Sequence, residues 1–312
     1  MMLRRIAVVV AVCVLLFGNV PSAFALSVYD GSLGIATIRD DPEGIVLVGY
    51  VENARMTEKS ESTDFVITKT LKSHPALKGK KVITTPRFIP IPDPKNPPRF
   101  LVLGEVLKDG TIDLLRGFTE TPALTEYVEG LLKLDAKDRV KALQYAFEYL
   151  DHKETDISMD AFAAFDAATD AEIRKTAPKL SAEKLRTRLV ARETPPARVG
   201  LYAFLLAHHG KAEDVKAIRK ILDDPEPSRD LRRDEVLIGY VLLDPKAGYE
   251  YLLSLVSDPK TEFFPKYAGL KTLRFYWATR PDVLTKKQIL AGMTALLNDA
   301  DIADMSIDSL RG

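Results

Sequence analysis

Between about residue 30 and residue 118, the apolar residues form short runs rich in β-branched side chains, separated by glycine, proline and clusters of charge. This pattern is typical of β-strands. Lys108, Asp109 and Gly110 separate the last two runs and predict a hairpin turn, because Asp-Gly tolerates the positive φ that such turns require. We therefore expect a small β-barrel or sandwich over residues 28–120. Its strands are expected at residues 45–52, 63–71, 81–85, 100–106 and 111–117.

One segment of this domain, residues 86–98, contains six prolines in thirteen positions. Proline fixes φ and has no N–H to donate to a β-ladder, so the segment cannot be a central strand. An extended loop of polyproline character is expected instead. Its apolar side chains, Phe88, Ile89 and Ile91, are candidate partner-binding residues. The alternative interpretation is a stiff connection laid across the barrel.

After Pro122 the apolar residues follow helical spacing. Three segments resemble one another, and Leu205, Val241 and Tyr276 occupy matching positions in them, at spacings of 36 and 35 residues. Each segment is followed by a polar turn and a second helix, and a helix pair repeating at this period predicts an α-solenoid over residues 123–312. The first helices are expected at residues 198–209, 234–243 and 266–279, and the second helices at residues 213–222, 247–256 and 286–297, the last with a capping box of Thr285 and Gln288.

The helical repeats resemble degenerate HEAT-type units over about residues 135–312. Residues 43–51 (EGIVLVGYV), 65–72 (FVITKTLK) and 99–104 (RFLVLG) are similar to the oligonucleotide/oligosaccharide-binding (OB) type of barrel in netrin-like and metalloprotease-inhibitor-like domains. In that family an N-terminal cysteine chelates the zinc of the target enzyme and disulfides staple the barrel; this sequence has no counterpart of either. The resemblances imply an α+β fold, with a small OB-like β-barrel followed by an α-solenoid of HEAT-like helix pairs.

The N-terminal residues predict export from a bacterial-type cell. Arg4 and Arg5 precede twelve apolar residues, 6–17, which are followed by the triplet Ala23-Phe24-Ala25. This is the pattern of a secretory signal peptide over residues 1–25, with cleavage before Leu26. Twelve residues are too few to span a bilayer, which needs about 20. The mature protein is expected to be periplasmic or extracellular, and the alternative is an uncleaved N-terminal anchor.

Composition narrows the classes of partner. Cys13 is the one cysteine, so the chain after the signal peptide can form neither a disulfide nor a thiolate metal site. The signal region contains two of the 44 basic residues and none of the 44 acidic ones, which leaves a mature net charge of about −2. Such a chain has no strong field to attract nucleic acid or an anionic membrane. We expect no nucleic-acid binding and no transmembrane segment in the mature chain.

Catalytic motifs are missing from the sequence. It contains no G-x-S-x-G, H-E-x-x-H, P-loop or G-x-G-x-x-G pattern. His208 and His209, near Glu213 and Asp214, have the residue types of a metal site, but a pair before Gly210 is more typical of a helix C-terminal cap. We therefore predict a non-catalytic protein without a metal or cofactor. A hydrolase with a dispersed active site is the remaining enzymatic alternative.

An aromatic run occupies residues 274–280 and includes the one tryptophan of the chain. Tyr276 and Trp277 match Val241 and Leu242 of the preceding repeat, so both are expected in the core. If exposed, the run would instead offer a platform for a sugar, a base or a peptide proline.

The HEAT resemblance implies that the second helices line a concave binding surface. Their outward residues form a mildly basic face, for which the alternative interpretation is an ordinary solvated surface. We predict a scaffold protein that binds a protein or polymer partner through this helical surface; the alternative is an inhibitor or modulator of an extracellular enzyme that acts through the β domain and its proline-rich loop. The candidate residues are Lys216, Arg219, Lys220, Tyr251, Lys286 and Lys287.

The last residues, 302–310, begin another first helix. Ile302 and Met305 can pack on the preceding unit, whereas Ile307 and Leu310 lie on a different side of the helix. No later sequence covers them, so we expect this helix to be covered by a partner or a second copy, or to mark a truncated longer array.

Overall fold

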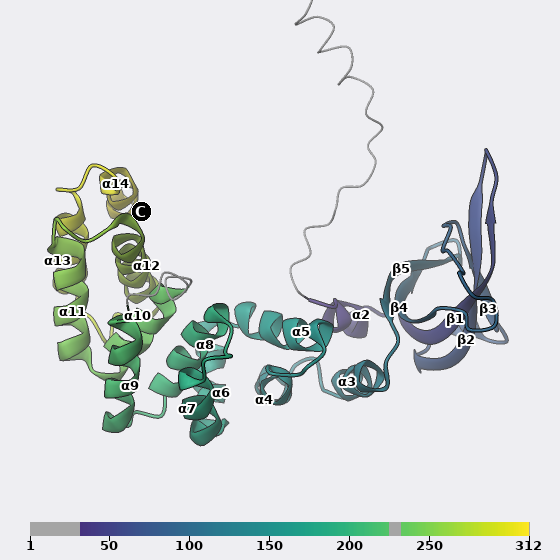
Figure 1. Ribbon diagram of the computed structural model, residues 1–312, viewed down its shortest axis with the longest axis horizontal. Helices are drawn as coiled ribbons and strands as arrows, with labels where there is room; N and C mark the ends of the chain where they lie inside the picture. Colours follow the sequence, from purple (N-terminus) through teal and green to yellow (C-terminus); the bar gives the residue numbers. More distant parts are fainter. Residues whose placement is uncertain (1–31, 225–231, 312) are drawn as a thin grey trace, which may run out of the picture.

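The computed structural model describes residues 32–224 and 232–311; the predicted signal peptide, residues 1–25, lies outside the described residues. The chain is α+β, with an antiparallel sheet followed by an array of helices. Figure 1 shows the sheet at one end of an elongated molecule and the later helices at the other. None of the helices in the described ranges combines the length and the apolar character that a membrane crossing needs.

All five predicted strands are confirmed, and so is the hairpin turn. The N–H of Leu107 donates to the carbonyl of Thr111 at 2.8 Å, and Gly110 adopts a φ of +82°. The strands form one sheet in the order β3-β2-β1-β4-β5, with every neighbouring pair antiparallel. They are β1 (Gly44–Met56), β2 (Glu61–Lys72), β3 (Val82–Thr85), β4 (Arg99–Val106) and β5 (Ile112–Thr119).

The sheet is open, so the expected small β-barrel is not formed. Its two edge strands, β3 and β5, lie near each other but share no ladder of backbone hydrogen bonds. The physical reason is the short β3, which ends where Pro86 removes the next backbone donor. The side chain of Arg87 reaches across instead, and its Nη1 donates to the carbonyl of Leu114 at 2.7 Å.

Both faces of the sheet are buried along β1, which explains its continuous apolar run. Ile45 and Leu47 point into an inner core that also holds Phe65. Val46 and Val48 point to the opposite face, which is covered by α2 (Ile35–Asp40) and α3 (Pro122–Leu132). Successive side chains of a strand alternate between faces, so a strand covered on both sides shows no polar alternation.

Asp160 joins the sheet end of the molecule to the helices. Its carboxylate, buried on α5 (Thr155–Asp166), accepts the N–H of Leu33 at 2.6 Å and the hydroxyl of Tyr127 at 2.7 Å. Burial, followed by the charge of Asp160, raises the pKa of Tyr127 well above its ordinary value, so the phenol stays a donor. α5 is therefore tied to α3 and to the residues just before α2, which cover one face of the sheet, through a buried, charge-assisted contact.

The three predicted helix pairs are present as α8/α9, α10/α11 and α12/α13. The predicted capping box at the start of α13 is confirmed: Thr285 accepts the N–H of Gln288 at 3.3 Å, and Gln288 accepts the N–H of Thr285 at 3.0 Å. The helices after α5 are α6 (Asp170–Thr176), α7 (Ala182–Val190), α8 (Pro196–Ala207), α9 (Ala212–Leu222), α10 (Arg233–Leu243), α11 (Pro245–Ser257), α12 (Phe263–Thr279), α13 (Lys286–Leu296) and α14 (Ala303–Arg311), and α4 (Arg139–Tyr149) precedes α5.

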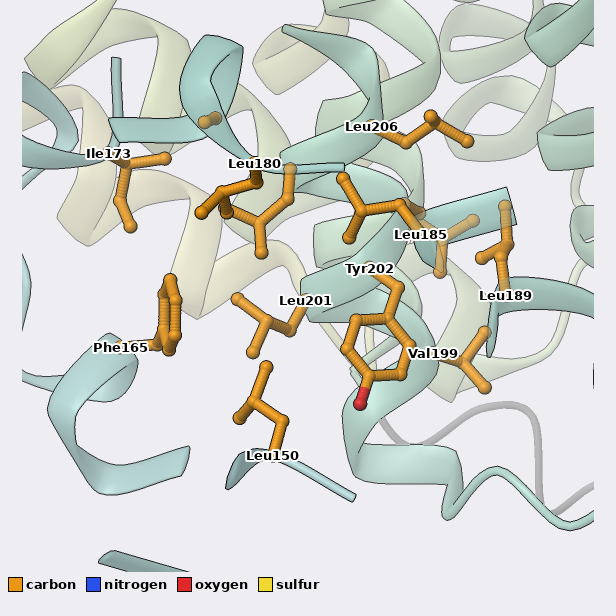
Figure 2. Close-up of a cluster of buried hydrophobic side chains, with 14 of the residues drawn as sticks. Leu150, Phe165, Ile173, Leu180, Leu185, Leu189, Val199, Leu201, Tyr202 and Leu206 are labelled. Carbon is orange, nitrogen blue, oxygen red and sulfur yellow. The ribbon is translucent and has the colours of Figure 1, made fainter. Parts of the chain in front are cut away.

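Each first helix packs on the next. α8 contacts α10 and α10 contacts α12, while α11 contacts α13 in the other layer. The hydroxyl of Tyr276 donates to the carbonyl of Ile238 at 2.7 Å, so even the buried polar group links neighbouring units. Figure 2 shows the apolar cluster beneath α8, in which Tyr202 and Leu201 lie among side chains from several helices, including Leu150 and Phe165.

Tyr276 and Trp277, adjacent residues of the aromatic run on α12, lie in different environments. Tyr276 is 0% exposed, as expected, but Trp277 is 39% exposed, so its predicted core position is wrong. Adjacent residues on a helix point about 100° apart, and the first-helix core takes only one of them. The ring of Trp277 lies 5.5 Å from Nζ of Lys286 at the start of the next helix.

The last helix, α14, packs on α12 and α13 through polar as well as apolar contacts. Ile302 is buried beside it, as expected, whereas Met305 is exposed. The hydroxyl of Ser306 donates to the carbonyl of Met293 at 2.7 Å. Leu310 is also exposed and Ile307 is half-buried, so self-association through this helix stays a prediction.

Candidate functional site

The basic candidates on the second helices are solvated and spread apart. Lys216 and Lys220 are exposed on α9, and Lys286 and Lys287 are exposed at the start of α13. Lys286 lies over the ring of Trp277, and the side chains of the other three make no ion pair or hydrogen bond among the described residues. A surface of separate flexible lysines presents charge without a fixed geometry.

Arg219 and Tyr251 are the two candidates that the structure brings together. The guanidinium of Arg219 lies 4.2 Å from the centre of the Tyr251 ring and pairs with Asp223, one helical turn away, at 2.9 Å. These contacts, with the Asp223 hydrogen bond first, raise the pKa of Arg219. Neither residue lines any of the four cavities described below, nor do the four lysines.

The proline-rich segment is fixed on the sheet. The hydroxyl of Thr63 on β2 donates to the carbonyl of Arg87 at 2.8 Å and accepts the N–H of Ile89 at 2.9 Å. Ile89 lines a cavity of about 230 Å³ on the inner face of the sheet. Phe88 and Ile91 line a separate cavity of about 490 Å³ against the end of β1. The three candidates of this loop thus divide between two hollows.

The largest of the four cavities lies on the first helices, where the sequence offered no candidate. Its volume is about 580 Å³, and we call it the first-helix groove. The fourth cavity, of about 370 Å³, lies between α2, α4 and α5. The groove is lined by residues of α5, α6, α8, α10 and α12 and by those just before α10: Phe162, Phe165, Asp166, Ala168, Asp170, Ile173, Leu201, Phe204, Arg232, Asp234, Glu235, Ile238, Tyr267, Lys271, Arg274 and Phe275.

Arg232 organises one rim of the groove. It precedes α10 with a φ of +58°, a left-handed conformation that costs a non-glycine residue about 1 kcal/mol. Its Nη2 donates to both carboxylate oxygens of Asp166 on α5, at 2.7 and 2.9 Å, and its Nη1 pairs with Glu235. The guanidinium also lies 4.9 Å from the centre of the Phe162 ring. The strained backbone is therefore held by contacts to α5 and α10.

Glu235 is the most perturbed acid of the groove. Burial raises the pKa of its carboxyl to about 7, although the neighbouring Arg232 acts to lower it. One carboxylate oxygen, Oε2, is buried without a hydrogen-bond partner among the residues that the structure describes. That oxygen packs against Gly200 of α8, where an added Cβ would lie 2.6 Å from it. Gly200 therefore allows α8 and α10 to approach closely at the groove.

Two further basic side chains of the groove, Lys271 and Arg274, are also held by contacts within the protein, whereas Oδ1 of Asp170 is buried without a hydrogen-bond partner among the described residues. Nζ of Lys271 lies 2.6 Å from the carboxylate of Asp234. Nε of Arg274 donates to the hydroxyl of Ser309 at 2.6 Å, which ties α12 to α14. These contacts hold the rim side chains in place before any partner arrives.

Aromatic rings form the floor of the groove. The rings of Phe204 on α8 and Phe275 on α12 meet edge to face, with their centres 5.8 Å apart. Phe204 also meets His208, whose Nδ1 lies 2.9 Å from the Phe204 carbonyl. The predicted C-terminal cap by His208 before Gly210 is thereby confirmed, and burial lowers the pKa of this imidazole.

Sequence reasoning missed the groove because its residues lie in five separate elements. One available signal was Phe275, which belongs to the aromatic run of residues 274–280. Another was the charge concentrated around Arg232 and Glu235, at the start of a helix that is otherwise apolar. Neither signal indicates that Arg232, just before α10, pairs with Asp166 on α5, because the two residues are 66 positions apart in the sequence.

Among the residues that the structure describes, no group of three His, Cys, Asp or Glu side chains is arranged to hold a metal ion. Comparisons with protein-family models, with curated proteins and with solved structures found no match to this chain.

Proposed function

We propose that this protein is an exported binding protein that holds a segment of a partner polypeptide in the first-helix groove. The observation that carries the proposal is the groove itself: an aromatic floor built by α8 and α12, bordered by ion pairs that exist before binding. Side chains that are already ordered lose little entropy when a partner binds, so such a surface favours affinity.

The composition of the groove favours binding over catalysis. Its described lining residues include no Ser, Thr, Cys or His, so it lacks the side chains of the usual nucleophile and base pairs. The carboxylates of Asp166 and Glu235 share one guanidinium, that of Arg232, which holds both oxygens of Asp166 and Oε1 of Glu235. The groove therefore offers contact surface rather than reactive groups.

A polypeptide segment suits this surface better than a highly charged polymer. The volume of about 580 Å³ accommodates several side chains, and ligand sites generally occupy about 300–1,000 Å³. Phe204, Ile238 and Phe275 offer apolar contacts at the floor. Acidic and basic side chains both line the groove, so the partner is expected to carry apolar anchors flanked by residues of both charges.

The array that bears the groove is proposed to be a HEAT-like α-solenoid. Two observations support this. Each first helix contacts the next first helix, and two side-chain hydrogen bonds join α12 to α10. Thr272 bonds to the carbonyl of Asp234, and Tyr276 bonds to that of Ile238, in both cases 38 residues earlier in the chain. Units that stack in this way form the continuous grooves of repeat proteins.

The test is capture of partners by purified protein, with the groove filled in one variant. Ala168 lines the groove, so Ala168→Phe should occupy it. Ala171 is exposed on α6 outside the groove, so Ala171→Phe is the matched control. Partners that wild type and A171F retain should be lost by A168F, with all three proteins equally folded by circular dichroism. Retention of every partner by A168F would refute the proposal.

Export is a separate part of the proposal and has its own test. N-terminal sequencing of the protein recovered from outside the cytoplasm should give Leu26 as the first residue, because the Ala23-Phe24-Ala25 triplet fits a signal-peptidase site. A chain that begins at Met1 and sediments with membranes would favour the uncleaved anchor instead.

A further inference from the structure

The inner face of the open sheet contains a cavity with a different chemistry from the groove. Its volume is about 230 Å³, and apolar side chains make up most of its wall. An apolar cavity of about 150 Å³ is enough to bind benzene in an engineered protein, so this one has room for a larger apolar body. The apolar wall is formed by Val51, Phe65, Ile89, Phe100, Val102 and Leu114.

The cavity exists because the sheet does not close. It lies where β3 and β5 approach without pairing, under the part of the proline-rich segment that Thr63 fixes. Gly117 on β5 leaves its wall without a side chain. A Cβ added there would meet Phe100 and Val102 at 3.8 and 3.9 Å, which is ordinary contact. Neither space nor backbone conformation at this position requires glycine, and a larger side chain there would enter the cavity.

Two polar groups, those of Thr85 and Arg87, lie in the otherwise mostly apolar wall of the cavity. Thr85 is 4% exposed and lines the wall, yet its hydroxyl has no hydrogen-bond partner among the described residues. Buried hydroxyls are normally bonded, so this one is a candidate for a ligand contact. Arg87 lines the same cavity with a side chain that is 53% exposed, which places the guanidinium where the cavity meets solvent.

The guanidinium of Arg87 has N–H groups that can donate to a ligand. Its Nη1 donates to the carbonyl of Leu114, whereas its Nη2 lies 4.0 Å from the carboxylate of Asp113, beyond hydrogen-bond distance. A planar guanidinium edge fits a carboxylate in a bidentate pair. The proximity of Asp113 favours a ligand head with a single negative charge over a phosphate dianion.

We propose that this cavity is a second binding site, independent of the first-helix groove, for a monocarboxylic acid with an apolar body, such as a medium-chain fatty acid. The hydrocarbon contacts Phe65, Phe100 and Val102 inside the curled sheet. The carboxylate pairs with Arg87 at the opening, and Arg116 also lines this region. The proline-rich segment thereby acquires a role, since it carries Arg87 and Ile89 to the site.

The test is calorimetric titration of the full-length mature protein with decanoate and, as a neutral isostere of similar length, decanol. Decanoate should bind about tenfold more tightly than decanol, because only the acid can pair with Arg87. Arg87→Gln should remove that preference while leaving decanol binding within about twofold. The matched control is Arg55→Gln, since Arg55 is 54% exposed on β1 and does not line the cavity.

A second variant tests the location. Gly117→Leu should weaken both ligands more than about tenfold, whereas Thr119→Leu, two residues along the same exposed edge, should not. Absence of decanoate binding to wild type, or unchanged binding to G117L, would overturn the proposal. Equal affinity for decanoate and decanol would overturn the role of Arg87.

A lipid headgroup is the other source of an anionic amphiphile, and vesicles of phosphatidylglycerol distinguish it. The proposal predicts no cosedimentation with the vesicles. Cosedimentation that G117L abolishes, without binding of decanoate, would overturn the assignment to a free acid. Binding of decanoate should be unaffected by A168F, so failure of this proposal is separable from failure of the groove.

Discussion

The first-helix groove and the second-helix face lie on different layers of the same array. They differ in whether their basic side chains are solvated or are paired within the protein. On the second helices, Lys216, Lys220 and Lys287 extend into solvent. On the first helices, Arg232 and Lys271 are each fixed by a carboxylate from the protein itself. The resemblance to HEAT-type units pointed to the second-helix face, but the groove combines ordered charge with an apolar floor.

The comparison shows that charge alone is a poor guide to a binding surface on an array of helices. Isolated surface charges contribute little to affinity and are screened by salt. A partner gains more from aromatic side chains that are already packed against one another, as Phe204 and Phe275 are. The same layer contains the largest cavity, so shape and composition point to one place.

The largest expected difference is in the free energy of unfolding that is lost when an aromatic side chain is removed from each layer. Tyr202 is fully buried beneath the groove, whereas Trp277 faces the second-helix side and is partly exposed. Tyr202→Ala should lower the free energy of unfolding by about 3–5 kcal/mol, because a buried aromatic leaves a cavity. Trp277→Ala should cost about 1 kcal/mol or less. Urea denaturation measures both, and equal losses would remove the contrast.

A smaller effect concerns pH and the buried acid of the groove. The pKa of Glu235 is about 7 in the folded protein and near 4.5 when unfolded, so between these values the folded state binds more protons. The free energy of unfolding should therefore fall as pH rises from about 4.5 through 7.

The variant Glu235→Gln removes this titration and keeps the shape of the side chain. It should be more stable than wild type at pH 8 by about 1–3 kcal/mol, with little difference at pH 4.5. Thermal denaturation across that pH range gives the comparison. Parallel stability curves for the two proteins would show that Glu235 does not titrate as described.

The smallest expected effect is the difference in stability between a variant that loses an organised ion pair and a variant that loses a solvated cation. Asp166 is half exposed, so Asp166→Asn should cost only about 0.5–1 kcal/mol, and less at 1 M salt, even though it frees one side of Arg232. Lys216→Gln on the second-helix face should change stability by less than about 0.3 kcal/mol. A larger loss for K216Q than for D166N would reverse the ranking of the two faces.

Local patterns predicted the elements well because they depend on neighbouring residues. The strands and the Asp109-Gly110 turn follow from β-branched runs and turn chemistry, and the α13 capping box follows from Thr285 and Gln288. Long-range geometry was harder. Whether β3 pairs with β5 depends on the segment that starts at Pro86, and no periodicity shows that the sheet stays open.

The site was less predictable than the fold for the same reason. Phe88 and Ile91 were identified from composition, and they do line a cavity, but nothing local indicates that Ile89 lines a different one. The exposure of Trp277 depends on which of two adjacent aromatics the core accepts. Which side chain is buried, and which cavity it lines, depends on packing between elements rather than on the sequence of one helix or loop.

Site-specific photocrosslinking tests the central claim, that the first-helix groove is where a partner binds. A photoreactive phenylalanine analogue would replace Phe275 in the groove and, in a second protein, Lys220 on the exposed face of α9. The account predicts that position 275 crosslinks to one contiguous segment of a partner, identified by mass spectrometry, and that A168F abolishes the product. Crosslinking of the same partner from position 220 but not from position 275 would contradict it.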